Sequence, residues 1–177
     1  MVVTTDMQTQ QKPASLVRVD GLTKLYPISK GVLSRQRSHV HAVDGVDFEV
    51  RRGESYGLVG ESGSGKTTTG RLLVRLTDPT SGTILFRDEN AAPTDIATLK
   101  GRALKRFRRR AQMIFQDPYE SMNTRRTILD TIAEPLKVQK VGGSIERLER
   151  VSELLELVGL TPPNTYLFRY PHELSGG

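Results

Sequence analysis

The sequence predicts an α/β fold in which short hydrophobic strands are joined to amphipathic helices. First, a period-two run formed by Val46, Phe48 and Val50 indicates a half-buried strand. Second, a glycine-rich segment over residues 60–67 separates an apolar strand from a helical pattern. Third, apolar residues recur at helical spacing over residues 145–158. These patterns predict a sheet in the N-terminal part of the chain and helices in the C-terminal part.

The strands are expected within the first 115 residues. A first strand over residues 16–20 continues toward Tyr26 and breaks at Pro27. Further strands are predicted over residues 43–50, 55–59, 83–86 and 111–115. A helix is predicted from Lys66 to residue 76, where the turn-forming residues 78–82 end it.

The remaining residues are expected to be loop and helix. Residues 116–126 have the composition of a loop. A helix is predicted over residues 128–138, and Pro135 is expected to kink or divide it. Ser144 is the expected N-cap of a last amphipathic helix, and Gly159 is its expected C-terminal stop.

The composition describes one domain of ordinary size. The 177 residues are 36% hydrophobic and 26% charged, which excludes disorder throughout. The chain has no cysteine, which excludes a disulfide scaffold and a thiolate metal site, and its three histidines argue against zinc. No stretch of apolar residues approaches the roughly 18 that a membrane span needs. Residues 1–15 lack the hydrophobic core of a signal peptide and are expected to form a flexible tail. We therefore expect a cytosolic protein, unless a partner holds it at a membrane.

The positive charge is concentrated in one segment. Residues 100–110 contain seven lysines and arginines and no acidic residue, so without them the formal net charge of +6 becomes −1. A protein that follows phosphates along a nucleic acid spreads its charge over a broad face, so we do not expect nucleic acid as a partner. The segment is better explained as the solvated face of a helix. Its apolar positions are Ile96, Leu99, Ala103 and Phe107.

The glycine-rich segment matches the phosphate-binding pattern G-x-x-x-x-G-K-[ST] at every fixed position. Its residues are Gly60, Glu61, Ser62, Gly63, Ser64, Gly65, Lys66 and Thr67. Average composition produces this match on the order of once in a few hundred chains of this length. Glycines let backbone N–H groups point at phosphates, and the following helix adds the positive end of its dipole. Lys66 is expected to reach the β- and γ-phosphates, Thr67 to bind Mg²⁺, and Thr68 to contact the α-phosphate. The alternative is a glycine-rich turn that only caps a helix.

Three further segments distinguish among ATPases, GTPases and small-molecule kinases. They are Tyr26 in a Leu-Thr-Lys-Leu-Tyr run, Gln116 in the run Gln-Met-Ile-Phe-Gln-Asp-Pro-Tyr, and a final Leu-Ser-Gly-Gly over residues 174–177. With these segments, residues 16–177 resemble the ATP-binding subunit of ABC transporters, most closely that of oligopeptide and dipeptide importers. One departure is Asn123, which Thr124 follows where peptide importers usually have proline. The guanine-reading pattern Asn-Lys-x-Asp is absent from the sequence, which disfavours a GTPase.

The resemblance implies the cofactors, the roles of the site residues and the partners. It implies that ATP and Mg²⁺ bind, that Tyr26 stacks on adenine, and that Gln116 reaches Mg²⁺ and the attacking water. It also implies that Ser175, Gly176 and Gly177 contact the γ-phosphate held by a second ATP-binding subunit. The implied partners are that subunit, transmembrane permease subunits and, indirectly, a solute-binding protein. The implied location is the cytoplasmic face of the membrane, where the subunit is peripheral.

The resemblance also implies a partial domain. Residues 16–115 correspond to an antiparallel β subdomain and P-loop core, and residues 116–177 to the Q-loop and helical subdomain, which leaves the core sheet incomplete. The family's Walker B aspartate, catalytic glutamate and switch histidine have no counterpart within residues 1–177. We therefore expect a truncated chain that binds ATP and barely hydrolyses it. A soluble ABC protein that acts on RNA or ribosomes, and a non-catalytic truncated regulator, remain as alternatives. The sequence does not encode the transported solute.

Overall fold

The computed structural model of the chain describes residues 15–28, 38–88, 91–116 and 122–174. The chain divides into two units, Met1–Met113 and Ile114–Gly177, and each is described by itself. Of the expected tail over residues 1–15, only Ser15 belongs to the described residues. Within the described ranges, no helix combines the length and the apolar character needed to cross a membrane.

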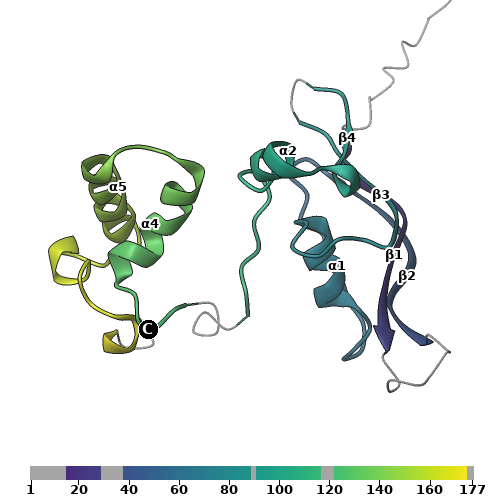
Figure 1. Cartoon of the computed structure of the whole chain (residues 1–177), viewed down its shortest axis with the longest axis horizontal. Helices are drawn as coiled ribbons and strands as arrows, with labels where there is room; N and C mark the ends of the chain where they lie inside the picture. The colour runs from purple at the N-terminus through teal and green to yellow at the C-terminus, as the bar shows by residue number, and fades with distance from the viewer. Residues whose placement is uncertain (1–14, 29–37, 89–90, 117–121, 175–177) are drawn as a thin grey trace, which may run out of the picture. The chain divides into compact units, whose positions relative to one another are not determined.

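The first unit is built on an antiparallel sheet with the strand order β2-β1-β3-β4 (Figure 1). The strands are β1 (Ser15–Ile28), β2 (Ser38–Arg51), β3 (Ser81–Phe86) and β4 (Thr94–Asp95). β1 is central: Val19 pairs with Phe48 of β2 and with Ile84 of β3. The strands predicted over residues 16–20, 43–50 and 83–86 are therefore confirmed, and each is longer than expected.

Pro27 does not end β1, contrary to the sequence prediction. It pairs with His39 of β2, and β1 continues to Ile28. The pairing of β1 with β3 ends at Thr23, so among the described residues Pro27 has a neighbouring strand on one side only. A proline is tolerated at such an edge because its missing N–H is not needed for a second ladder.

Two helices complete the core of the first unit. Helix α1 (Lys66–Leu73) and helix α2 (Gly101–Phe107), which follows a 3₁₀ turn over Ile96–Thr98, lie on the same side of the sheet in Figure 1. The rings of Phe86 and Phe107 meet edge to face, with centroids 5.4 Å apart. The buried core joins the sheet to both helices and consists of Val19, Leu22, Val43, Leu72, Ile84, Ile96 and Phe107.

Two predicted strands are wrong. Residues 55–59 and 111–115 have no strand structure, and Val59 and Ile114 are each 97% exposed. Both segments have the composition of buried strands, but an extended segment becomes a strand only when a neighbour supplies hydrogen-bond partners. No segment among the described residues pairs with either of them.

The second unit is helical. Helix α4 (Ile128–Gln139) packs against helix α5 (Ser144–Leu157), and 3₁₀ turns follow at Pro163–Thr165 and Pro171–Glu173. The core of this unit consists of Ile128, Ala133, Val151, Leu155 and Leu167. Gly159 follows α5 with φ 81°, as expected for a glycine that ends a helix.

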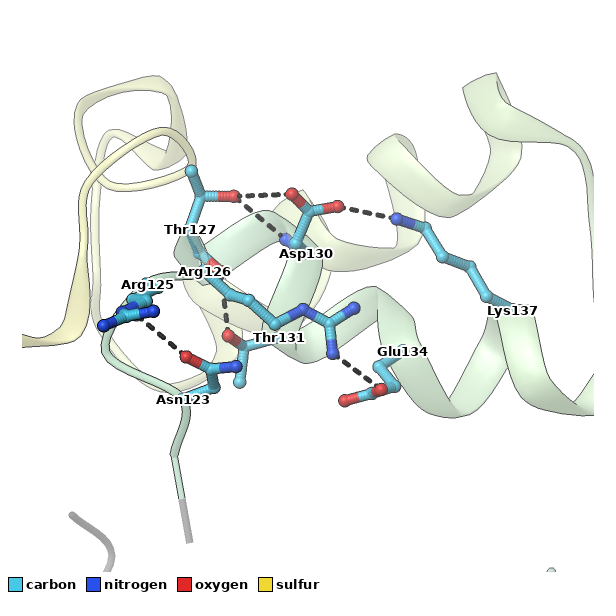
Figure 2. Close-up of polar contacts among 8 residues, drawn as sticks. All are labelled: Asn123, Arg125, Arg126, Thr127, Asp130, Thr131, Glu134 and Lys137. Atoms are coloured by element: carbon cyan, nitrogen blue, oxygen red, sulfur yellow. Dashed lines mark hydrogen bonds and ion pairs between the residues drawn. The ribbon is translucent and has the colours of Figure 1, made fainter. Parts of the chain in front are cut away.

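Polar contacts fix the start of α4 (Figure 2). The Thr127 hydroxyl accepts a hydrogen bond from the backbone N–H of Asp130 at 3.2 Å, which caps the helix. The Asp130 carboxylate pairs with Lys137 at 2.6 Å, and Arg126 pairs with Glu134 at 2.6 Å. The bond from Lys137 is the largest cause that lowers the pKa of Asp130 below its ordinary value.

Two helix details differ from the predictions. Pro135 is exposed and does not divide α4, so the predicted division is wrong, while the predicted kink stays a prediction. The buried face of α4, with Ile128 and Ala133, packs in the core of the unit. Packing therefore outweighs the lost backbone bond at Pro135. Ser144 is the first residue of α5 rather than its cap. The cap is Gly143, whose backbone N–H donates to the Glu146 carboxylate at 2.6 Å.

Candidate functional site

The glycine-rich loop of the first unit leads directly into α1. Gly65 is the N-cap of the helix and has a left-handed conformation with φ 89°. A Cβ at Gly65 would lie 2.2 Å from the backbone oxygen of Ala42 in β2, and a Cβ at Gly60 would lie 2.7 Å from the Ser64 hydroxyl. Side chains at these two positions would therefore push the loop away from β2 or distort it. Gly65 therefore lets the loop lie tightly against β2, and Gly60 lets the loop pack closely on its own Ser64.

A cavity of about 340 Å³ lies where this loop meets β2. The strand contributes Val40, His41 and Ala42, and the other lining residues come from the loop and the first turn of α1: Ser62, Gly63, Gly65, Lys66, Thr67 and Thr68. Its volume falls within the range of small-molecule sites, roughly 300–1,000 Å³. The predicted phosphate-binding loop thus forms one wall of a cavity of suitable size for a ligand.

Backbone donors make this cavity suited to an anion. Within the described part of the chain, the N–H groups of Gly63, Gly65 and Lys66 have no hydrogen-bond acceptor. The first turn of α1 has no acidic residue that would neutralise the positive end of the helix dipole. Free N–H groups at a helix N-terminus bind phosphate. The residues present therefore fit the triphosphate of a nucleotide.

Lys66 places its charge inside the loop. Its Nζ donates to the backbone oxygen of Gly60 at 2.8 Å, to that of Glu61 at 2.6 Å, and to the Ser64 hydroxyl at 3.3 Å. These three contacts hold the ammonium group beside the loop. Thr69, one turn into α1, is buried, and its hydroxyl donates to the backbone oxygen of Gly65 at 3.0 Å. The helix and the loop are therefore held together by polar contacts.

The predicted site residues outside the loop are not all brought to this cavity. Tyr26 pairs with Val40, which lines the cavity, but Tyr26 is not itself part of the lining. Tyr26 is 40% exposed, and Lys24 Nζ lies 5.0 Å from the centroid of its ring. Gln116 is exposed and belongs to the second unit. Residues 175–177, which include the predicted Ser175, Gly176 and Gly177, lie outside the described residues.

The sequence prediction missed the strand side of the cavity. Val40, His41 and Ala42 reach the loop because β2 passes beside Gly65. Of the three, His41 has a polar contact of its own, with its Nδ1 3.4 Å from the Asp44 carboxylate. No local pattern in the sequence marks these residues, because the contact joins segments that are distant along the chain.

Comparisons with known proteins find one family profile and several relatives that match this chain. The profile of a family described as ABC transporter matches residues 43–177. The chain is 42% identical over 170 residues to the oligopeptide transport ATP-binding protein AppF of Bacillus subtilis strain 168, covering 96% of this chain and 50% of AppF. It is 46% identical over 162 residues to the glutathione import ATP-binding protein GsiA of Escherichia coli strain K12, covering 92% of this chain and 25% of GsiA. The chain therefore spans about half of the first relative and a quarter of the second.

Solved structures agree on the fold. A dimeric post-hydrolysis state of the ATP-binding cassette MJ0796, bound to ADP and Pi, matches with a TM-score of 0.66 at 25% identity, covering 90% of this chain and 63% of that chain. A second dimeric structure of MJ0796, described as a bacterial ABC transporter cassette, matches with a TM-score of 0.67 at 24% identity, with the same coverage.

Proposed function

This chain belongs to the ABC transporter family, and on that premise we propose that it is the ATP-binding part of an importer. The observation that carries the proposal is the cavity in which the Gly60–Thr67 loop, the N-terminus of α1 and Lys66 converge. Identities of 42% to AppF and 46% to GsiA support the importer class.

We propose the following roles in binding ATP. The loop amides and Lys66 hold the β- and γ-phosphates, and Thr68 contacts the α-phosphate. Thr67 and Gln116 hold Mg²⁺, which supplies charge neutralisation for phosphoryl transfer. Tyr26, which is partly exposed, stacks on the adenine through the face of its ring that Lys24 does not cover.

The importer relatives suggest the class of solute. AppF is named for oligopeptide transport and GsiA for glutathione import. We propose that this chain serves the import of a solute of that type. The same comparison supports its partners: permease subunits in the membrane, a solute-binding protein that acts through them, and a peripheral position on the cytoplasmic face.

A second ATP-binding subunit is part of the proposal. Both MJ0796 structures are described as dimeric. We propose that residues 175–177 reach the nucleotide of the partner subunit. We also propose that residues 16–115 and 116–177 act as the nucleotide-binding and helical subdomains. We propose that the 177-residue polypeptide binds ATP and hydrolyses it slowly.

Titration of the 177-residue chain with ATP and Mg²⁺ tests the proposal. Lys66→Ala removes the ammonium group and is expected to cost about 2–5 kcal/mol of binding free energy. Ser64→Ala is the matched control, because it keeps the backbone donors of the same loop and removes only a weak 3.3 Å contact. Equal affinities in these two variants would contradict phosphate binding at this loop.

The RNA-binding alternative is weaker because the basic segment is partly used within the chain. Arg108 donates to the backbone oxygen of Arg75, and Arg110 pairs with Asp88. Lys105 and Arg109 also have interaction partners. Strongly salt-dependent RNA binding that is lost on neutralising residues 108–110 would favour the alternative.

A further inference from the structure

A second cavity, of about 370 Å³, lies in the first unit beside α2. It shares no residue with the cavity at the glycine-rich loop. Its apolar lining consists of Phe86, Ala91, Ile96, Leu99, Ala103 and Phe107. Its polar lining consists of Asp88, Thr94, Arg106 and Arg110.

The floor of this cavity is part of the folded core. Ile96 is 2% exposed and Phe107 is 6% exposed, and both belong to the core of the unit. Phe107 is held edge to face against Phe86 of β3. The floor is therefore an ordered apolar surface rather than a gap between loosely placed side chains.

Helix α2 forms one side of the cavity, and helical spacing explains which of its residues face the cavity. Residues three and four apart lie on the same face of a helix, so Ala103, Phe107 and Arg106 share the face of α2 that meets the cavity. Arg110, three residues beyond Phe107, continues this side. An apolar surface and two guanidinium groups thus line the same cavity.

The described lining of this cavity carries more positive than negative charge, which suits an anionic ligand. Arg110 forms an ion pair with the Asp88 carboxylate. The guanidinium of Arg106 has no ion pair or hydrogen bond with any of the described residues. Among the described residues of the lining, Asp88 is the single acidic one, against two arginines. An incoming negative charge would therefore complement the lining.

We propose that this cavity binds a small amphipathic carboxylate, with its apolar body on Phe86 and Phe107 and its carboxylate at Arg106 and Arg110. The ion pair with Asp88 shows that a carboxylate fits beside the Arg110 guanidinium. Arg106, whose guanidinium has no partner among the described residues, supplies the positive charge for a second carboxylate. Arginine is suited to this ligand because its planar donors match the two carboxylate oxygens. A volume of about 370 Å³ is near the lower end for small-molecule sites, which favours a short apolar chain.

The first test measures the binding of octanoate to the 177-residue chain by isothermal titration calorimetry. Acetate carries the charge without the apolar body, and octan-1-ol carries the apolar body without the charge. We expect octanoate to bind with one-to-one stoichiometry and each comparison compound to bind at least tenfold more weakly. Absence of octanoate binding, or equal binding of octanol, would overturn the proposal.

The second test locates the site with variants of α2. Arg106→Gln removes the guanidinium charge, and Ala103→Leu fills the cavity with a residue that favours helix; each is expected to weaken octanoate binding at least tenfold. Arg102→Gln is the matched control, because Arg102 lies on the same helix outside the lining and should leave the affinity unchanged. Far-UV circular dichroism confirms that each variant is folded. Unchanged affinity in both folded cavity variants, or an equal loss in Arg102→Gln, would place octanoate elsewhere and overturn the proposal.

Discussion

Gly65 approaches Ala42 so closely that a Cβ at Gly65 would lie 2.2 Å from the Ala42 backbone oxygen. This contact seats the phosphate-binding loop on β2 and closes the cavity between them. Both the conformation of Gly65, with φ 89°, and the space around it exclude a larger residue. The candidate ATP site thus depends on a backbone contact as well as on its polar side chains.

Gly65→Ala is therefore expected to lower the affinity for ATP at least tenfold, because the loop must move away from β2. Gly53→Ala is the matched control. Gly53 also has a positive φ, of 75°, but nothing lies within 4 Å of its added Cβ. The control should cost about 1–2 kcal/mol of unfolding free energy through backbone strain and leave the affinity for ATP unchanged. If both variants bind ATP as the wild type does, the close approach does not shape the site.

Thr67→Ala is expected to weaken ATP binding in the presence of Mg²⁺ and to change it little in EDTA, because the proposed role of the hydroxyl is to bind the metal. Titrations of wild type and variant under both conditions give this difference directly. An equal loss with and without Mg²⁺ would mean that Thr67 contacts the nucleotide itself.

The cap of α4 gives a prediction for stability. Thr127→Ala removes the acceptor of the Asp130 N–H and should lower the free energy of unfolding by about 1 kcal/mol. Thr124→Ala, at an exposed position before the helix, is the control and should change it by less than about 0.5 kcal/mol. Chemical denaturation followed by circular dichroism measures both. Equal effects would argue against capping by Thr127.

The contact between Asp130 and Lys137 gives a prediction for pH dependence. Lys137 lowers the pKa of Asp130 in the folded chain. A carboxyl group whose folded pKa is depressed stabilises the fold above its unfolded pKa of about 3.9 and loses that contribution as the pH falls through the folded pKa. Asp130→Asn should therefore be less stable than wild type at pH 7, and the difference should shrink under acid conditions.

An NMR titration of the Asp130 carboxyl carbon measures this shift. Lys137→Gln should return the pKa of Asp130 toward its ordinary value, because it removes the largest cause of the shift. A pKa that stays equally low in Lys137→Gln would assign the shift to other neighbours of Asp130.

Pro135 gives the last prediction. It lies inside α4, where proline removes a backbone hydrogen bond, and its side chain is exposed. Pro135→Ala should raise the free energy of unfolding by about 1–3 kcal/mol. A decrease, measured by the same denaturation assay, would show that the proline stabilises the helix end through contacts or through the unfolded chain.

The sequence predicted a strand correctly where apolar and polar residues alternate and the segment also has a strand to pair with. Val46, Phe48 and Val50 alternate and lie in β2, which pairs along β1. Residues 55–59 and 111–115 are equally apolar, yet they form no strand. Hydrophobicity alone could not distinguish these cases, because strand formation needs a neighbouring backbone that local composition does not reveal.

The sequence by itself determined the glycine-rich loop and the helix after it, because the spacing from Gly60 to Thr67 and the helix that begins at Lys66 are properties of consecutive residues. Only the tertiary structure decided what faces that loop. Val40, His41 and Ala42 line the opposite wall because the register of β2 and the bare backbone of Gly65 bring them there. The cavity beside α2 likewise required the packing of Phe107 on Phe86. Contacts between distant segments depend on how the whole unit packs, and no window of neighbouring residues contains that information.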